Sequence, residues 1–331
     1  MKILVFEFIT GGGLNDRLLP ENLVREGRLM LNALVKDLAD LPGLELYITR
    51  DYRLSDNLFP ENKNINWVDV PKNSNIKTLF KKLCLKCDLV WPIAPESDGI
   101  LAEYCRLVEA TNAKLLNSSA LTVELTGNKL QTFEYLSRGN IPIVSSIRLS
   151  EFQWRGNFKY VIKPIDGVGC ESSHIGNNNA EFEKIIGKIS NPSEYIIQPF
   201  MEGRSISLSC LVNNQRAWLI CCNEQIMKIQ NQQFLLTGCT VNIKLDNRSK
   251  YDDILNKIAG MLPDLWGYVG IDLIETRNGP MVLEINPRLT TSYVGIKGAL
   301  GINFAENVLQ MLNGDPIIRH INNHTKLVEV L

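Results

Sequence analysis

The stretch from Gly267 to Ser292, GYVGIDLIETRNGPMVLEINPRLTTS, constrains the fold of this chain most strongly. Its apolar runs predict two short strands joined by a tight turn at residues 277–280. Side chains alternate across a strand, so Asp272 lies on one face of the first strand, while Glu284 and Asn286 share one face of the second. We therefore expect a hairpin with one apolar face and one acidic face.

The acidic face of this hairpin predicts a cation site. A turn with an odd number of residues would place Asp272 across from Asn286 and diagonal to Glu284. Mg²⁺ prefers oxygen ligands and often takes one or two carboxylates while phosphates and water complete its shell. We predict that these three residues hold Mg²⁺, with Mn²⁺ as an alternative ion. The competing interpretation is a surface hairpin with exposed acids, which seldom alternate with runs of Leu, Ile and Val.

Composition narrows the class of protein. The 331 residues are enough for two or three subdomains, and a formal net charge of -1 argues against nucleic acid or a membrane surface as the main partner. No apolar run is long enough to span a bilayer, and the opening MKILVFEFIT predicts a buried strand rather than a signal peptide. Eight cysteines, mostly in apolar runs, predict reduced thiols in the cytoplasm. Cys84 and Cys87 lack a second pair, which favours buried thiols over a metal or redox site.

The first part of the chain predicts a parallel α/β domain at residues 1–115. Strands are expected at residues 2–9, 44–49, 65–70, 89–94 and 114–116, with helices at 21–39 and 100–110. Open α/β sheets bind ligands at the carboxyl ends of their strands. The candidate substrate residues at those ends are Thr10, Gly11, Gly12, Glu96 and Ser97. A mobile loop at 10–13 and a helix cap at 96–98 are the alternatives.

A second charged feature is Lys163, in a predicted strand at residues 159–164. A charge in an apolar strand needs an anionic partner, and Gly167 and Gly169 follow in a loop whose amide groups can fold over phosphates. This is not a Walker motif, because no Gly-Lys-Ser or Gly-Lys-Thr follows. We predict phosphate binding here, with a plain hairpin turn as the alternative.

The remaining pattern completes the chain. Helical segments are expected at residues 121–139, 180–188, 252–262 and 302–312, and strand-like segments at 141–144, 195–203, 205–212 and 217–222. The hairpin of the last two strands ends in Asn223-Glu224-Gln225, whose polar groups are predicted to point toward the site, although a plain strand end is the alternative.

Taken together, Asp272, the run Glu284-Ile285-Asn286-Pro287-Arg288, the upstream lysines and the glycine loop resemble the ATP-grasp superfamily of carboxylate-amine ligases. The resemblance covers residues 115–315. It implies an α/β protein with the ATP-grasp fold: the N-terminal domain at 1–115, a linker helix at 116–141, a small α+β lid at 142–200 and a C-terminal α+β core at 201–331.

The resemblance also implies an ATP- and Mg²⁺-dependent reaction through an acyl phosphate. Its ATP contacts would be Lys129, Lys163, Gly167, Gly169, Gln198, Phe200, Met201, Glu202 and Ser205. The family's usual ribose-binding acid is replaced here by Ser205, with Glu202 as the alternative contact. Lys163 and Arg288 would act in catalysis by neutralising phosphate charge and by stabilising the acyl phosphate or the substrate carboxylate.

Three segments, at residues 6–13, 93–99 and 223–225, are similar to the tyramine-glutamate ligase group of methanofuran biosynthesis. This implies that the γ-carboxylate of glutamate is joined to an aromatic amine, with no nucleic-acid or membrane partner, and leaves a homodimer open. The substrate residues would be Thr10, Gly11, Gly12, Glu96, Ser97, Glu224 and Arg288. The alternatives are a ligase for another pair, as in the D-alanine ligases or the pyrrolysine pathway ligase, and a nucleotide-binding regulator. The intact metal triad and both lysines argue against a regulator.

Overall fold

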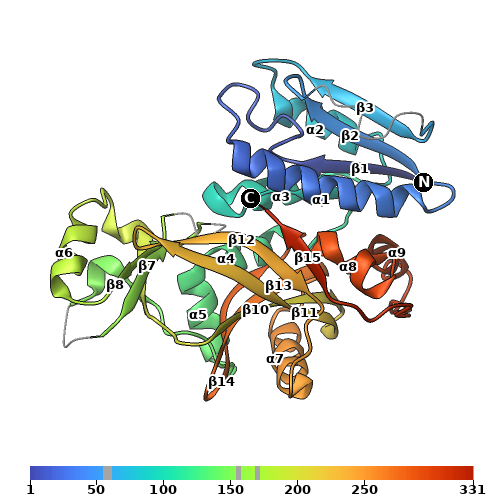
Figure 1. Cartoon of the computed structure of the whole chain (residues 1–331). Coiled ribbons are helices and arrows are strands. Elements are labelled where there is room, and N and C mark those ends of the chain that lie inside the picture. Colours follow the sequence, from blue (N-terminus) through green and yellow to red (C-terminus); the bar gives the residue numbers. More distant parts are fainter. Residues whose placement is uncertain (55–61, 154–157, 168–171, 331) are drawn as a thin grey trace.

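The computed structural model describes residues 1–54, 62–153, 158–167 and 172–330, so Gly169 lies outside the described residues. Figure 1 shows an N-terminal domain at the top, a core with a long curved sheet below it, and a small body at the left that carries α6, β7 and β8. We call this small body, with strands β6 to β9 and helix α6, the lid.

The N-terminal domain is built on a parallel sheet in the order β3-β2-β1-β4-β5. Its strands are β1 (Lys2–Glu7), β2 (Glu45–Asp51), β3 (Ile65–Val70), β4 (Leu89–Ile93) and β5 (Lys114–Leu115). All five lie where the sequence predicts them. Strand order reverses at β1, so the loops after β1 and β4 flank the point where open sheets of this kind bind ligands.

Helices cover both faces of this sheet, which explains its continuous apolar strands. Helix α1 (Glu21–Ala39) packs on one face, while α2 (Ile76–Cys84) and α3 (Ile100–Glu109) pack on the other. Cys84 and Cys87 are buried at the end of α2, and burial raises the pKa of Cys84 to about 12 and that of Cys87 to about 11. These values agree with the predicted inert thiols.

The core and the lid share one largely antiparallel sheet in the order β14-β13-β10-β11-β12-β8-β7-β9-β6, and β15 pairs with β12. The lid strands are β6 (Ile147–Arg148), β7 (Tyr160–Pro164), β8 (His174–Gly176) and β9 (Tyr195–Pro199). The core strands are β10 (Arg204–Asn213), β11 (Arg216–Gln230), β12 (Gln233–Val241), β13 (Gly267–Thr276), β14 (Gly279–Asn286) and β15 (Lys326–Glu329). The lid joins the core through the pairing of Gln233 with His174, at the tip of the β11–β12 hairpin.

The prediction that a strand ends at residues 223–225 is wrong. Strand β11 continues to Gln230, and β12 returns along it, so Glu224 lies in the middle of a strand. The turn between them places Asn231 and Gln232 at positive φ, 51° and 63°. The expected strand at residues 141–144 is also wrong, because Pro142 stands there and only Ile143 forms an isolated bridge, to Val282.

The predicted helix at residues 121–139 is two helices, α4 (Ala120–Gly127) and α5 (Lys129–Ser137). The extended backbone of Asn128, with φ -96° and ψ 104°, separates them, and its side chain caps α5 by accepting from the amide of Gln131. The other helices are α6 (Asn179–Ile186), α7 (Arg248–Met261), α8 (Tyr293–Leu300) and α9 (Phe304–Gln310). Across the described ranges, no helix is both long and apolar enough to cross a membrane.

Helix α1 connects the N-terminal domain to the core through a buried acid. The hydroxyl of Tyr293 in α8 donates to Oδ2 of Asp37 at 2.7 Å, and Nζ of Lys297 lies 3.1 Å from Oδ1. Asn303 donates to the Asp37 carbonyl at 2.7 Å. Burial raises the pKa of Asp37, and the bonds from Tyr293 and Lys297 oppose this rise. The interface between the N-terminal domain and the core, here called the seam, is thus stabilised by polar as well as apolar contacts.

We expect Tyr293→Phe to lower the free energy of unfolding by about 1.5–3 kcal/mol, because it removes a hydrogen bond to a buried carboxylate. Urea unfolding at neutral pH measures the loss. The matched control is Tyr47→Phe, whose hydroxyl donates at 2.8 Å to the half-buried Glu45. This control is expected to change stability by less than about 0.5 kcal/mol. Equal losses in the two variants would contradict a special role for the seam.

Candidate active site

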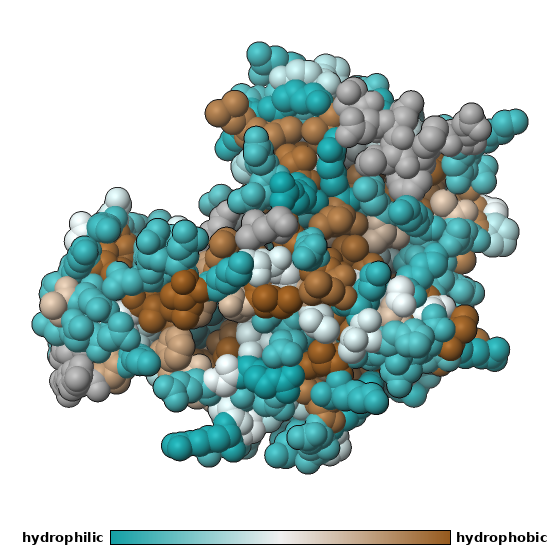
Figure 2. Space-filling view, viewed as in Figure 1, coloured by the Kyte–Doolittle hydropathy of each residue, from teal (hydrophilic) through white to brown (hydrophobic). Residues whose placement is uncertain are grey.

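A cavity of about 350 Å³ lies where the lid, the core sheet and helix α1 meet. In the space-filling view, apolar side chains lie across the middle of the molecule, beneath the notch between the lid and the N-terminal domain (Figure 2). Of the residues singled out in the sequence, twelve line the cavity: Lys129, Lys163, Gly167, Gln198, Phe200, Met201, Ser205, Gln225, Asp272, Glu284, Asn286 and Arg288. Residues far apart in the chain therefore share one chamber.

The β13–β14 hairpin places Asp272 directly opposite Glu284, not opposite Asn286 as predicted. The turn contains two residues, Arg277 and Asn278, and the register shifts after Asp272. Leu283 is the extra residue of this β-bulge. The three predicted ligands nevertheless gather, because Nδ2 of Asn286 donates to Oδ2 of Asp272 at 3.3 Å.

The pKa values of the two facing carboxyl groups are shifted in opposite directions. Burial and the neighbouring Glu284 raise the pKa of Asp272. Burial also acts to raise the pKa of Glu284, but Lys129 and Lys163 outweigh it, so that pKa is lowered. Nζ of Lys129 lies 3.6 Å from Oε2 of Glu284. A divalent cation would relieve the repulsion between the two acids, so the donor set of two carboxylates and an amide oxygen fits Mg²⁺.

No cluster of three or more His, Cys, Asp or Glu side chains suited to a metal occurs among the described residues. A cation held by Asp272 and Glu284 would therefore need further oxygen atoms from water or from a ligand. Nucleotide phosphates supply such oxygens in many magnesium sites.

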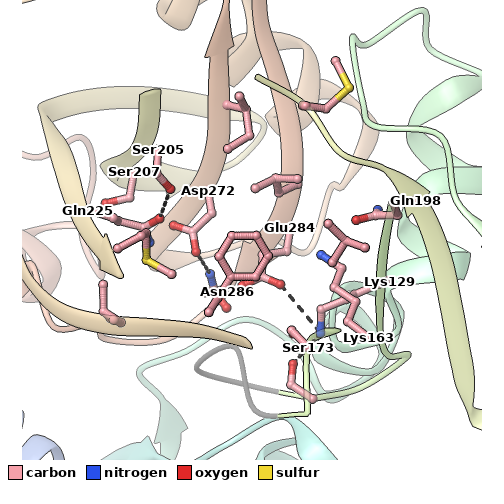
Figure 3. Close-up of a pocket in the computed structure, with 18 of the residues that line it drawn as sticks. Lys129, Lys163, Ser173, Gln198, Ser205, Ser207, Gln225, Asp272, Glu284 and Asn286 are labelled. Atoms are coloured by element: carbon pink, nitrogen blue, oxygen red, sulfur yellow. Dashed lines mark hydrogen bonds and ion pairs between the residues drawn. The ribbon is translucent and has the colours of Figure 1, made fainter. Parts of the chain in front are cut away.

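The lysines reach the carboxylates from two separate elements (Figure 3). Lys129 is the first residue of α5, and its buried amino group also donates to the carbonyl of Gly167. Lys163 comes from β7 in the lid. Because the helix break at Asn128 starts α5 at Lys129, this break fixes where that lysine enters the cavity.

The other end of the cavity is mostly apolar. The ring of Phe200 is parallel to that of Phe234, with centroids 6.4 Å apart and 5° between the planes. Nε2 of Gln198 donates at 2.7 Å to Oγ of Ser146 in a buried bond. Phe234 belongs to β12, which the sequence patterns did not reveal. The alternating apolar residues at 227, 229, 234 and 236 were the signal that could have found this wall.

Ser205 and Gln225 lie together on the cavity wall, where Oγ of Ser205 donates to Oε1 of Gln225 at 2.8 Å. Glu202, the alternative ribose contact, is exposed and is not part of the lining. Glu224 lies on the opposite face of β11, because side chains alternate and Gln225 faces the cavity. Nη2 of Arg204 lies 3.1 Å from its carboxylate. The structure therefore does not bring Glu224 to the cavity.

Four further candidates, Thr10, Gly11, Gly12 and Ser97, are not part of the lining. The Thr10 hydroxyl turns inward and donates to Oε2 of Glu7 at 2.6 Å. Gly12 has φ +91° and would place a Cβ 2.6 Å from Val70, so it serves close packing. The predicted contact of the first glycine loop with a substrate is therefore not seen in this geometry.

Glu96 contacts Arg288 directly. Nε of Arg288 donates to Oε2 of Glu96 at 2.8 Å, and both side chains are largely buried. Nη1 of Arg288 donates to the Leu289 carbonyl at 3.1 Å. Burial acts to lower the pKa of Arg288, but Glu96 outweighs it, so the pKa is raised. Glu96 thus fixes the guanidinium and keeps it charged.

One cavity residue had no signal in the sequence. Glu26, on α1, accepts a hydrogen bond at 2.5 Å from the hydroxyl of Thr291, and both residues line the cavity. Glu26 lies within the helix expected at residues 21–39, and its sequence position does not mark it as a site residue. Only the packing of α1 on the core brings it to the chamber.

Two family models match this chain. Residues 126–292 match the model described as an ATP-grasp domain, and residues 44–123 match a pre ATP-grasp domain. A tyramine–L-glutamate ligase of Methanocaldococcus jannaschii is 27% identical over 298 residues, covering 89% of this chain and 84% of the relative. That of Methanocaldococcus fervens is 28% identical over 301 residues, covering 89% of each chain.

Solved structures share the fold. A structure from Archaeoglobus fulgidus assigned to the ATP-grasp superfamily has a TM-score of 0.73 at 22% identity, covering 99% of this chain and 92% of that one. An L-amino acid ligase from Bacillus licheniformis has a TM-score of 0.67 at 16% identity, covering 96% and 74%. The predicted ATP-grasp fold, with a parallel α/β domain at the N-terminus, is confirmed.

The buried Glu7 behind the cavity gives a pH prediction. Burial raises the pKa of Glu7 to about 7 from its ordinary 4.5, although bonds from Thr10 and Ile9 oppose the rise. An acid with a raised pKa stabilises the fold below pH 4.5 and loses that contribution as the pH rises through about 7. Between about pH 5 and pH 8, wild-type stability should therefore fall relative to Glu7→Gln, by up to about 3 kcal/mol.

Urea unfolding at both pH values measures this difference. The control variant is Glu21→Gln, at an exposed position in the first turn of α1. The free energy of unfolding of this control should equal that of the wild type at about pH 5 and at about pH 8. A constant difference between Glu7→Gln and the wild type would show that Glu7 does not titrate in this range.

Proposed function

We propose, because the chain belongs to the ATP-grasp family, that it is an ATP-dependent, ADP-forming ligase that joins a carboxylate to an amine. The observation that carries the proposal is the opposition of Asp272 and Glu284 to Lys129 and Lys163 in one cavity. This arrangement has the charges that a magnesium nucleotide requires, with acids for the cation and lysines for the phosphates.

In this proposal Asp272, Glu284 and Asn286 hold Mg²⁺, which when bound would neutralise charge on the phosphate oxygens. Lys129 and Lys163 contact the phosphates. The adenine ring lies at the apolar end, between residues such as Phe200, Met201 and Phe234, and Gln198 reaches its amino group. Catalysis then depends on positioning and on fixed charges, because transfer through an acyl phosphate needs no nucleophile from the protein.

The proposed reaction has two steps. A carboxylate oxygen of the acid bonds to the γ-phosphorus of ATP while the bond from that phosphorus to ADP breaks, which gives an acyl phosphate. The amine nitrogen then bonds to the acyl carbon, inorganic phosphate leaves with the bonding electrons, and the nitrogen loses a proton. Arg288, held by Glu96, would bind the carboxylate and the negative charge that develops on the acyl group.

We further propose glutamate, through its γ-carboxylate, and tyramine as the substrates, which would link the protein to methanofuran biosynthesis. The support is the two tyramine–L-glutamate ligases that align with most of this chain. The described cysteines are free and buried, which supports the reducing cytoplasm as the compartment.

We expect purified protein with Mg²⁺ and ATP to release ADP only when both glutamate and an aromatic amine such as tyramine are present. Coupled ADP detection against a matrix of amino acids and amines measures this, and mass spectrometry identifies the amide. ADP release with another pair would keep the ligase class and change the substrates. Absence of amine-dependent ADP release with every pair would refute the ligase and favour a nucleotide-binding regulator.

Glu284→Gln should lower turnover at least about 100-fold at saturating Mg²⁺, because it removes an ionised oxygen donor while keeping the shape of the side chain. The matched control is Glu275→Gln. Glu275 lies on the same strand, three residues after Asp272, and is paired with Arg204 and bonded by Tyr251 outside the cavity. The control should keep most of the activity. Wild-type turnover in Glu284→Gln would refute the assigned cation site.

A further inference from the structure

The wall of the cavity formed by helix α1 carries an acid with no role in the proposed function. Three acids line the cavity among the described residues, namely Glu26, Asp272 and Glu284. The last two form the pair that faces the lysines. Glu26 comes from the N-terminal domain and lies among the hydroxyl groups that follow Arg288.

These hydroxyl groups hold Glu26 in place. Oγ1 of Thr291 donates to Oε1 of Glu26, and Thr291 is itself buried. The flanking residues Thr290 and Ser292 bond to each other at 2.9 Å, and Thr290 bonds to the buried Tyr268 hydroxyl at 2.7 Å. The carboxylate therefore rests on a rigid network rather than on a mobile surface side chain.

Among the described residues, Glu26 forms no salt bridge. Arg288 is close enough to interact with it electrostatically, but Nε of Arg288 is bonded to Glu96. A second acid, Glu7, lies behind Glu26, since a Cβ on Gly27 would stand 2.7 Å from the Glu7 carboxyl group. Oε1 of Glu96 is buried and accepts no hydrogen bond within the described ranges. Carboxyl oxygens of Glu26 and Glu96 at or near this end of the cavity can therefore accept hydrogen bonds from a cationic ligand.

We propose that Glu26 binds the α-ammonium group of the amino-acid substrate, so that the enzyme selects an α-amino acid over the matching acid without an amino group. The inference rests on the proposed ligase function and names the group that recognises its acid substrate. Arg288 and Glu26 are close enough to interact electrostatically, so one zwitterionic molecule can meet both.

The Glu26 carboxylate is a better partner for the α-ammonium group, which stays charged, than for the amine that attacks the acyl phosphate, which must be neutral. An adjacent negative charge raises the pKa of an ammonium group and keeps it protonated. A protonated amine has no lone pair and cannot attack the acyl phosphate. Glu26 would therefore also keep the amino acid's own nitrogen from reacting, which leaves the second amine as the nucleophile.

The test compares glutamate with glutarate, which lacks only the amino group, in the wild type and in Glu26→Gln. We expect the wild type to prefer glutamate. Glu26→Gln should lower kcat/KM for glutamate about 10- to 100-fold, because it removes a charged hydrogen-bond partner. The kcat/KM for glutarate and the KM for tyramine should stay unchanged. Glu21→Gln, an exposed position on the same helix, should behave as the wild type.

An unchanged preference for glutamate over glutarate in Glu26→Gln would overturn the inference. A rise in the KM for tyramine alone would also overturn it, because Glu26 would then bind the amine substrate. Retained glutarate turnover reports that the variant is folded. Where Glu26→Gln fails to fold, Thr291→Val, which releases the Glu26 side chain, should lower the glutamate preference in the same direction. An unchanged preference there would also count against the inference.

Failure of the proposed function is distinguishable from failure of this inference. If no acid and amine release ADP, calorimetric binding of glutamate and glutarate in the presence of Mg²⁺ and a non-hydrolysable ATP analogue still compares the two proteins. Weaker binding of glutamate, but not glutarate, by Glu26→Gln would support the ammonium site without the ligase. Equal binding of glutamate by both proteins would overturn it.

Discussion

The opposition of Asp272 and Glu284 on the β13–β14 hairpin is the constraint on which the rest of the structure depends. Two carboxylates facing each other in a buried site repel, and ionising both is unfavourable without nearby cations. Lys129 and Lys163 supply that charge from outside the core, one from the linker helix α5 and one from the lid strand β7. The core, helix α5 and the lid therefore each contribute charged groups to one site, and the attraction between these groups favours this arrangement of the three parts.

The N-terminal domain completes the cavity from the other side. Its helix α1 docks on α8 through the buried Asp37, and its β4 loop supplies Glu96 to Arg288. These contacts join residues that are 256 and 192 positions apart in the chain. The end of the chamber that carries Lys163 is thus built within the core and lid, whereas the end that carries Glu26 exists only where the N-terminal domain meets the core.

Sequence patterns predicted the elements whose signal is local. The parallel strands are continuous apolar runs, and the acids of the central hairpin alternate with Leu and Ile. Two features depended on tertiary packing: the bulge at Leu283 changed the partner of Asp272, and Glu26 reached the cavity only through docking of α1. Strand β12 was missed for a local reason, because Gln rarely marks a left-handed turn such as that at Asn231 and Gln232.

The bulge at Leu283 shows why a local irregularity matters to the whole site. In a regular strand, neighbouring residues face opposite sides, so Leu283 and Glu284 could not both line one cavity. Here they do, and the hairpin contributes an apolar side chain toward the wall shared with Ile274 as well as a carboxylate opposite Asp272. An apolar surface and an acidic surface are thereby placed side by side by a single extra residue.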